Sequence, residues 1–576
     1  MENKRLTVIK NGKKLLPLGG IFLGACLLLL PQLYTHQMLL GSDSIFHYNR
    51  FYDTYMQLKE GNFQYFISMY GFQSSGRIVN ALYGPIIAYI NGFLLLLGKT
   101  WFNYQVLSDL VVYLLAGSSL YYLLRRAKVR VDLSLFLALF YMTTYAIQYW
   151  VQNQAFSGWA AALLPLSLVP VVTFVTKKEV NVLELACCTA LITQTHFLTS
   201  LFVIMAYIPA FLYAFWQSKT RGRLLKQLFQ AIGLFLLLTA NIWGSMLEIY
   251  QGDRLLPPFI NKNMASTAIA LTSYRLGNWL APFGIIIFSV LLIFLLLGGW
   301  KKLSPLSRLV SLEALTFLIL SSRLLPWQWL STHIPFVSLL QFPFRFFVPY
   351  TVLLLLALGT FANELALKKQ KIVVGGALVI TLLGMGQTAQ ILFKELAVWS
   401  EPTNFMYEKN TTFTQSDPEK IKQAFYSHDL SLGLEYVQKS TPDYLPVHTD
   451  TIDPRKVHGY RRYHAQVIAK EALFNKAVKN NKLIITWQAD ANEQRQVPVF
   501  IYRNTKLVLN GRPLAKEQLT YTWIGAAMLK QQKGFNKLEV TYAENKLTLT
   551  TLWLTGLSWG ICGLIGLKRK IRRRNF

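Results

Sequence analysis

The sequence predicts an α-helical polytopic membrane protein with about twelve transmembrane helices and one β-rich domain outside the membrane. Of its 576 residues, 53% are hydrophobic and only 15% are charged, whereas soluble proteins carry about 25% charged residues. Apolar runs long enough to cross a bilayer as a helix recur along the chain, as in 224–243, 281–297 and 346–362. A helix is favoured there because it satisfies every backbone polar group internally.

The distribution of charge supports the membrane assignment. The formal net charge is +30, from 58 basic and 28 acidic residues, and a basic protein of this kind can bind nucleic acid. Here, however, many basic residues form short clusters between the apolar runs. This is the pattern of cytoplasmic loops held at an anionic membrane surface. We therefore expect the lipid bilayer as a partner and no nucleic acid.

The basic clusters also set the expected orientation. Lys4, Arg5, Lys10, Lys13 and Lys14 precede the first span, 15–34, which places the N-terminus in the cytoplasm and the following loop, 35–103, outside. The apolar piece 79–97 is expected to lie at the outer interface or to re-enter the membrane. Counting it as a span would move the basic cluster at 125–130 to the outer side.

The remaining spans follow by alternation. They are 104–124, 131–146, 156–176, 183–195, 197–216, 224–243, 281–297, 310–320, 346–362, 372–392 and 547–567. Because 183–195 and 310–320 are short, the count can change by one or two. The prediction is a transmembrane domain at 1–393 with further outer loops at 245–280 and 321–345. A final helix and a basic tail follow at 546–576, and both termini are cytoplasmic.

The segment 394–545 is predicted to form an extracytoplasmic domain resembling a β-sandwich. Its second half shows the β-branched and aromatic alternation of strands in 482–490, 497–509 and 537–542. The dipeptide Asn510-Gly511 is a strong signal for a two-residue hairpin turn.

Titratable residues gather at the outer ends of the predicted spans. Charges that persist near a membrane usually line a water-filled site, so we expect several of these residues to converge on one cavity. They are Asp43, His47, Arg50, Asp53, Asp109, His196, Asp253, Arg254, His333 and Arg345.

The first cluster follows the first span directly. If 43–53 is helical, Asp43, His47 and Arg50 lie on one helix face. A carboxylate, an imidazole and a guanidinium together suit acid–base chemistry on a phosphate-bearing substrate, because the guanidinium fork matches phosphate oxygens. The alternative is that Asp43 caps an interfacial helix while its neighbours snorkel.

Three other positions each leave two interpretations open. His196 lies at the outer end of a span. It either contributes to the functional site or is a histidine whose hydrogen bonds are satisfied at a helix boundary. Arg345 lies at the start of a late span. It either contributes to the functional site or anchors the helix at the membrane interface. Asp109 falls inside an apolar span, where an acid needs a partner or a function. The sequence has no nucleotide-binding fingerprint, HExxH or CxxC motif.

Three motifs in this order resemble one bacterial family. They are Asp-x-x-x-His-x-x-Arg at 43–50, Thr-His-x-Leu-Thr at 195–199 and Gln-Phe-Pro-x-Arg-Phe at 341–346. Together they resemble the membrane proteins labelled "6-pyruvoyl-tetrahydropterin synthase-related" and the neighbouring YfhO-like proteins, which look like members of the GT-C glycosyltransferase superfamily. The resemblance covers about 15–365, with a looser similarity at 443–446 and in the β-rich domain. The chain has no His-rich zinc motif of a soluble pterin synthase.

The resemblance implies a glycosyltransferase that takes a sugar from a polyprenyl-phosphate carrier on the outer face. The acceptor would be an envelope component, such as a teichoic-type polymer or a glycolipid, bound with help from the β-rich domain. Asp43 matches the general base of such enzymes, and Arg50, His47, Arg254 and Arg345 are candidates to stabilise the leaving phosphate. Paired acids are common in this loop, but Ser44 and Ile45 follow Asp43. A metal-free site is therefore the simpler expectation, although a divalent cation stays open.

Two other functions remain. A flippase or transporter of lipid-linked glycans would also use Asp109 and a basic outer cavity. The one-sided distribution of titratable residues and the lack of internal repeats argue against it. A non-enzymatic envelope assembly protein would use the helices only to hold the β-rich domain at the surface.

Overall fold

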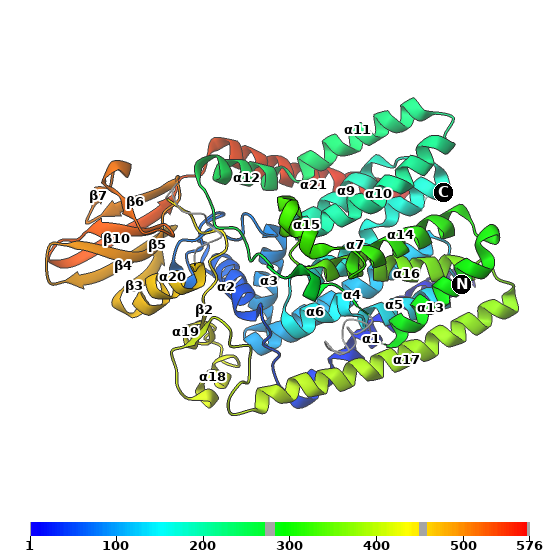
Figure 1. Ribbon diagram of the computed structural model, residues 1–576, viewed down its shortest axis with the longest axis horizontal. Coiled ribbons are helices and arrows are strands. Elements are labelled where there is room, and N and C mark those ends of the chain that lie inside the picture. Colours follow the sequence, from blue (N-terminus) through cyan, green and yellow to red (C-terminus); the bar gives the residue numbers. More distant parts are fainter. Residues whose placement is uncertain (1, 271–282, 449–457, 573–576) are drawn as a thin grey trace. The chain divides into compact units, whose positions relative to one another are not determined.

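The computed structural model describes residues 2–270, 283–448 and 458–572. It is mostly helical, with a β-rich region near the C-terminus (Figure 1). The chain divides into two compact units, each made of three separate stretches. Unit 1 comprises Met1–Gly41, Val106–Phe235 and Asn261–Glu401, and unit 2 comprises Ser42–Gln105, Leu236–Ile260 and Pro402–Phe576.

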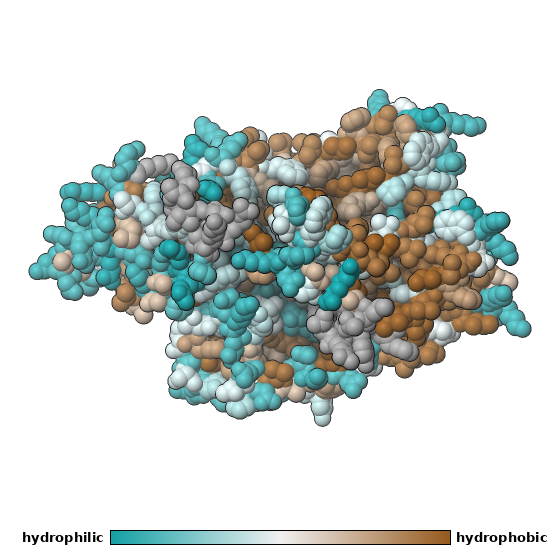
Figure 2. All heavy atoms as spheres, viewed as in Figure 1, coloured by the Kyte–Doolittle hydropathy of each residue, from teal (hydrophilic) through white to brown (hydrophobic). Residues whose placement is uncertain are grey.

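Nine helical segments within the described ranges are long and apolar enough to cross a membrane. They are formed by α1 (Glu2–Thr35), α4 (Trp101–Arg126), α5 with α6 (Val131–Met142, Tyr145–Asn153), α7 with α8 (Ser157–Ser167, Val169–Lys177), α10 (Phe197–Gln217), α13 (Phe283–Gly299), α16 (Phe347–Ala362), α17 (Leu367–Ala397) and α21 (Lys546–Arg572). Hydrophobic side chains gather over the helical part of the surface and hydrophilic ones over the β-strands (Figure 2). These helices indicate a membrane-embedded protein.

The count of twelve spans is not reproduced. The predicted span 224–243 consists of α11 (Arg221–Leu238) and α12 (Ala240–Gly252), bent by 63°. Counting this pair as one span gives up to ten. The other two are α9 (Val182–Thr195) and α14 (Pro305–Ser321), which at 1.5 Å per residue reach only about 21 and about 26 Å, against a hydrocarbon thickness of about 30 Å.

Parts of several predictions lie outside the described residues. These are residue 1 of the domain 1–393, positions 271–280 of the predicted loop 245–280, positions 281 and 282 of the span 281–297, positions 449–457 of the domain 394–545, and the last four residues of the basic tail.

The apolar piece 79–97 is not a long helix. Its helical part is α3 (Pro85–Gly98), which has 14 residues and packs against α2 (Ser44–Glu60) within unit 2. The two helices approach closely at Gly92, where a Cβ would lie 2.4 Å from Thr54 Oγ1. The Thr54 hydroxyl also donates to the carbonyl of Ala88 at 2.8 Å. These contacts fix α2 within unit 2.

The β-rich prediction is confirmed in its main features. An antiparallel five-stranded sheet has the order β3 (Asn475–Lys479), β4 (Lys482–Ala489), β10 (Gly534–Tyr542), β6 (Thr505–Leu509), β7 (Arg512–Pro513). A three-stranded antiparallel sheet has the order β5 (Gln494–Phe500), β9 (Ala526–Lys530), β8 (Thr520–Tyr521). Both sheets contribute to one hydrophobic core. Phe66, Met69 and Ile78 from the loop after α2 belong to the same core.

The single strand predicted at 497–509 is wrong. The chain forms β5 and β6 there, in different sheets, separated by a turn at 501–504. The turn is closed because the amide of Tyr502 donates to Thr505 Oγ1 at 3.0 Å and the amide of Thr505 donates to the carbonyl of Tyr502 at 3.0 Å. The Asn510-Gly511 hairpin is confirmed between β6 and β7, with φ of 49° and 80°.

Candidate functional site

Asp43 occupies the position just before α2. The helix begins at Ser44, and the Asp43 side chain makes no capping hydrogen bond to it. The Ser42 hydroxyl donates to Asp43 Oδ1 at 3.3 Å, and the residue is only partly buried. Asp43 is therefore the N-cap by position, but its carboxylate does not serve as the cap.

His47 and Arg50 lie on the buried side of the same helix. The Arg50 side chain is fully buried, and its guanidinium donates to Asn80 Oδ1 at 2.9 Å, to His47 Nδ1 at 3.1 Å and to the carbonyl of Tyr83. It also lies 4.5 Å from the centre of the Tyr83 ring. A ligand phosphate would have to displace these acceptors, so the contacts observed for Arg50 are those of a structural residue.

Two further residues of α2 hold a strained loop. The amide of Tyr70 donates to Asp53 Oδ1 at 2.9 Å, and the amide of Phe72 donates to Asn49 Oδ1 at 2.6 Å. Burial raises the pKa of Asp53 to about 6, although the backbone amides of Tyr70 and Gly71 oppose the shift. Phe72, Gln73 and Ser74 all have positive φ, a conformation that costs non-glycine residues about 1–2 kcal/mol each. The loop therefore needs the support that α2 provides.

Arg77 follows this loop and is fully buried. Its guanidinium donates to the carbonyl of Thr441 at 2.6 Å, to Thr441 Oγ1 at 3.0 Å and to the carbonyl of Asp443 at 2.6 Å. It also lies 4.5 Å from the centre of the Phe72 ring. Arg77 thus ties the loop after α2 to the segment 441–447.

The segment 441–447 is held along its whole length. The amide of Leu256 donates to the carbonyl of Leu445 at 2.8 Å, and the amide of Val447 donates to the carbonyl of Arg254 at 2.7 Å. Tyr444 has a φ of 64°, and its carbonyl accepts the Tyr502 hydroxyl at 3.0 Å. Strained residues persist where the surroundings over-determine them, often at functional sites. The Arg254 side chain is exposed beside this segment.

Asp43, Lys439 and Asp443 form an ionisable cluster. Burial raises the pKa of Asp443 to about 6; the Arg77 guanidinium opposes the shift and the charge of Asp43 adds to it. Lys439, at the end of β2 (Val437–Lys439), donates to the carbonyl of Ser42. Burial lowers the pKa of Lys439, and Asp43 opposes this shift. Asp43 therefore interacts electrostatically with a second carboxylate and with an ammonium that binds the carbonyl of the preceding residue.

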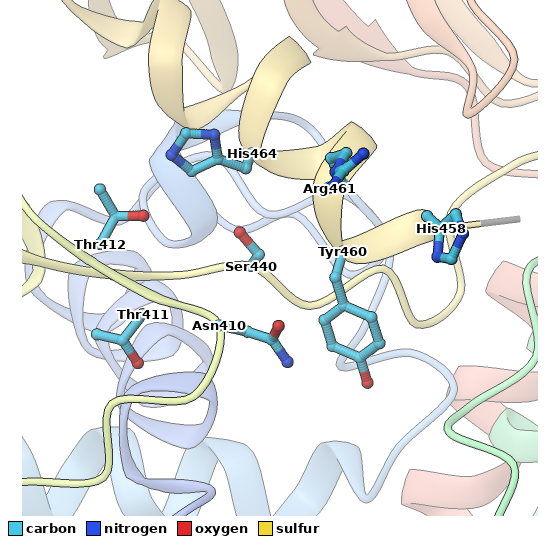
Figure 3. A pocket seen from close by; sticks show the side chains of 8 residues that line it. All are labelled: Asn410, Thr411, Thr412, Ser440, His458, Tyr460, Arg461 and His464. Atoms are coloured by element: carbon cyan, nitrogen blue, oxygen red, sulfur yellow. The ribbon is translucent and has the colours of Figure 1, made fainter. Parts of the chain in front are cut away.

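An open pocket of ≈ 470 Å³ lies within unit 2 (Figure 3). One side carries β1 (Thr411–Phe413) and the residue after β2, and the other carries α20 (Gly459–Gln466). The described lining residues are Asn410, Thr411, Thr412, Ser440, His458, Tyr460, Arg461 and His464. Hydroxyl, amide, imidazole and guanidinium groups suit a hydroxylated, anionic ligand.

Tyr460 connects the pocket with the ionisable cluster. Burial raises the pKa of its phenol to about 12, and the charges of Asp443 and Asp43 add to the shift. Ser440, in the same pocket, directly follows Lys439. The pocket thus includes the residue that follows Lys439, and one of its lining residues, Tyr460, interacts electrostatically with both acids.

Asp109 and His196 belong to unit 1. Asp109 lies in α4, fully buried, and neither carboxylate oxygen has a hydrogen-bond partner in the described part of the chain. His196 precedes α10, where its Nδ1 lies 2.8 Å from Thr199 Oγ1 and accepts from the Thr199 amide at 3.4 Å. His196 thus serves as a helix cap.

His333 and Arg345 also belong to unit 1. His333 ends α15 (Trp327–His333), is exposed and stacks on Trp329 with ring centres 4.6 Å apart. Arg345 donates to the carbonyl of Leu340 at 3.1 Å and lies 5.1 Å from the Phe342 ring centre.

Unit 2 thus contains six of the ten residues expected to converge, which are Asp43, His47, Arg50, Asp53, Asp253 and Arg254. Asp253 accepts from the amide of Arg503 at 2.8 Å through Oδ1. Sequence reasoning missed Arg77 and Lys439 entirely. A signal existed for Asp443, which opens the stretch 443–446 that carries the looser family similarity. Within residues 2–270, 283–448 and 458–572, no group of three or more His, Cys, Asp or Glu side chains could hold a metal ion.

Comparisons with known proteins found no matching family model and no matching curated protein.

Proposed function

We propose that the chain is a GT-C-like membrane glycosyltransferase. It transfers a sugar from a polyprenyl-phosphate carrier to an envelope acceptor on the outer face, with both termini in the cytoplasm. The observation that carries the proposal is the position of Asp43. It directly follows Ser42, whose carbonyl binds Lys439, and its carboxylate makes no helix cap. It interacts electrostatically with Lys439, Asp443 and Tyr460, of which Tyr460 lines an open polar pocket. The resemblance of 43–50 to the family motif supplies the reaction class.

In the proposed reaction, the acceptor hydroxyl attacks the anomeric carbon of the donor sugar. Asp43 removes the hydroxyl proton as the new carbon–oxygen bond forms. The bond between the anomeric carbon and the phosphate oxygen breaks, and its electron pair leaves with the lipid phosphate. Cationic groups stabilise that developing charge.

The pocket residues have matching roles in this proposal. Arg461, His458 and His464 bind anionic groups of the substrates, while Thr411, Thr412 and Ser440 bind hydroxyl groups. The Tyr460 ring offers a face on which a sugar can stack. Arg254 is a further exposed cation beside the segment 441–447. Arg50 and His47 keep α2 in place.

A complementation experiment in the native bacterium tests the proposal. The gene is deleted and restored as wild type, Asp43→Asn or Asp490→Asn, an exposed acid of the same unit. Membrane abundance is matched, and the sugar composition of the envelope is measured by mass spectrometry.

We expect deletion to remove one sugar. The wild type and Asp490→Asn should restore it, and Asp43→Asn should lower the rate of its addition by about 100-fold or more, the usual contribution of a general base. Full restoration by Asp43→Asn would show that Asp43 is not the base. No change in any envelope sugar on deletion would overturn the glycosyltransferase proposal.

A further inference from the structure

Both the pocket and the strained loop after α2 contact α20 (Gly459–Gln466). We propose that Tyr463 of this helix is a positioning residue: it bonds α20 to the loop at Gln73, so that binding of a phosphate group at Arg461 and the conformation of residues 72–74 depend on one another. The phosphate belongs to a substrate of the proposed glycosyl transfer, and in that respect the inference rests on the proposed function. The binding and its coupling to the loop need no reaction.

The two faces of α20 have different surroundings. Three of its residues line the pocket (Figure 3). Tyr463 is instead fully buried and stacks on Phe500 with ring centres 5.9 Å apart. The helix backbone is closely packed at Gly459, where a Cβ would lie 2.8 Å from Pro442. The contacts of the buried face therefore set the position of the side chains that face the pocket.

The bond between α20 and the strained loop is direct. The Tyr463 hydroxyl donates to Gln73 Oε1 at 2.8 Å and lies 3.5 Å from the carbonyl of Phe72. Lys476 of β3 donates to the carbonyl of Gln73, and Asn49 Oδ1 of α2 accepts from the amide of Phe72 at 2.6 Å. α20, β3 and α2 thus all hold residues with positive φ. Such a conformation persists only while its surroundings over-determine it.

The lining of the pocket favours a phosphate group. None of the described lining residues is acidic. Arg461 is exposed, and within the described ranges its guanidinium has neither a hydrogen-bond acceptor nor an ion-pair partner. Ser440 and Thr412 carry hydroxyl groups on the opposite side of the pocket (Figure 3). A guanidinium fork matches two phosphate oxygens, and the hydroxyl groups are donors for a third.

Arg462 provides a matched comparison on the same helix. It is exposed like Arg461 but does not line the pocket, and its guanidinium lies 5.2 Å from the centre of the Trp523 ring. The two arginines carry the same charge at neighbouring positions, so a general attraction for anions would involve both. A phosphate site in the pocket requires only Arg461.

Phosphate binding and the loop are linked through α20. A phosphate held between Arg461 and the opposite side of the pocket stabilises α20 in the position that forms the bond between Tyr463 and Gln73. Because a coupling free energy acts in both directions, the bound phosphate also stabilises the loop conformation. α2 holds this loop through Asn49 and begins directly after Asp43. Occupancy of the pocket is therefore transmitted to the helix that follows the proposed base.

The experiment measures phosphate binding and hydrogen exchange on the purified full chain in detergent. Inorganic phosphate is the probe, and chloride at the same ionic strength is the reference. The variants are Arg461→Gln, Arg462→Gln and Tyr463→Phe, of which the last keeps the aromatic ring and loses only the hydroxyl. Peptides covering 70–77 report on the loop.

In wild type, we expect saturating phosphate to slow exchange in 70–77 by about 10-fold, a usual size for such coupling. Arg461→Gln should weaken phosphate binding by about 10-fold or more, because it removes the guanidinium fork. Arg462→Gln should leave the affinity unchanged. Tyr463→Phe should lower the affinity less than Arg461→Gln does, but phosphate should no longer slow exchange in 70–77. A purely structural role of Tyr463 would speed exchange without removing the effect of phosphate.

Two results would overturn the proposal. Equal phosphate affinity of Arg461→Gln and Arg462→Gln would reject the phosphate site, and equal slowing by phosphate in wild type and Tyr463→Phe would reject the positioning role. Gln73→Leu removes the same hydrogen bond from its acceptor side, so its effect combined with Tyr463→Phe should not exceed that of either variant alone. Additive effects would show that the two residues act independently.

Two further probes identify the source of the phosphate. Geranyl phosphate carries the group on a short prenyl chain, as a lipid carrier does, whereas glycerol phosphate carries it on a polyol, as an anionic acceptor does. Tighter binding of geranyl phosphate assigns the pocket to the donor, and tighter binding of glycerol phosphate assigns it to the acceptor. Either result supports a phosphate site.

The phosphate experiment and the complementation experiment fail in different ways. Coupled phosphate binding without any change of envelope sugars on deletion would keep the site and reject the glycosyl transfer. An inactive Asp43→Asn together with no effect of phosphate on 70–77 would reject only the coupling.

Discussion

Asp53 and Asp443 are two acids of the same unit that are held in different ways. Burial raises the pKa of each to about 6. The Asp53 carboxylate accepts from the amides of Tyr70 and Gly71 and from the side chain of Gln57. Asp443 is instead held through its carbonyl. The Asp53 carboxylate therefore supports a loop directly, whereas the segment that carries Asp443 is held through its main chain.

The largest expected effect is on the segment that carries Asp443. Arg77→Met removes three hydrogen bonds from a charged donor and leaves their buried acceptors without a donor. This loss costs roughly 4 kcal/mol of local stability. Hydrogen exchange in peptides covering 441–447 should become on the order of 1,000-fold faster. Arg512→Met, at an exposed hairpin arginine, should leave this exchange unchanged. Unaltered exchange in Arg77→Met would show that other contacts are sufficient to hold the segment 441–447.

The second prediction concerns the pH dependence that Asp53 imposes. Its folded pKa is raised from 3.8 to about 6, so the folded state binds more protons than the unfolded state between these values. The stability that this group contributes is therefore full below pH 4 and falls by about 3 kcal/mol as the pH rises to above 6.

Asp53→Asn cannot ionise, so we expect the thermal unfolding midpoint of the detergent-solubilised chain to depend less on pH in that window. Asp490→Asn serves as the control with the wild-type dependence. If the unfolding midpoints of wild type and Asp53→Asn depend on pH in the same way, the pKa of Asp53 is not raised in the folded protein.

The smallest expected effect is at Asn49, which supports the same loop through one donor. Asn49→Ala leaves the buried amide of Phe72 without its acceptor and costs about 2 kcal/mol. Exchange in peptides covering 70–77 should rise on the order of 30-fold, while 441–447 changes less. Equal acceleration in both peptides would show that the two regions open together.

The fold was predictable where the pattern is long and repetitive. Nine of the expected spans correspond to apolar helical segments, and the Asn510-Gly511 turn is where its φ requirements indicate. The segment 224–243 is bent near Thr239, a feature that hydropathy does not record. There the amide of Asn241 is satisfied by Thr555 Oγ1 at 2.9 Å, a contact between residues far apart in the chain.

The site was predictable only in part for a related reason. The spacing on one helix singled out Asp43, His47 and Arg50. This spacing does not show which face of the helix is buried. The contribution of Arg77, Lys439 and Asp443 depends on pairing between segments more than 360 residues apart. No local pattern in the sequence encodes such a pairing.

The discontinuous make-up of unit 2 has a consequence for biosynthesis. Asp43 and Asp443, which both belong to unit 2, are separated by 400 positions. At about 5–20 residues per second, the ribosome reaches the second roughly 20 to 80 s after the first. During that interval α2 and the loop after it have been made without most of their hydrophobic core. The intervening helices are thus synthesised before unit 2 can be completed, and a chain released before residue 441 would carry Arg77 without the segment that it binds.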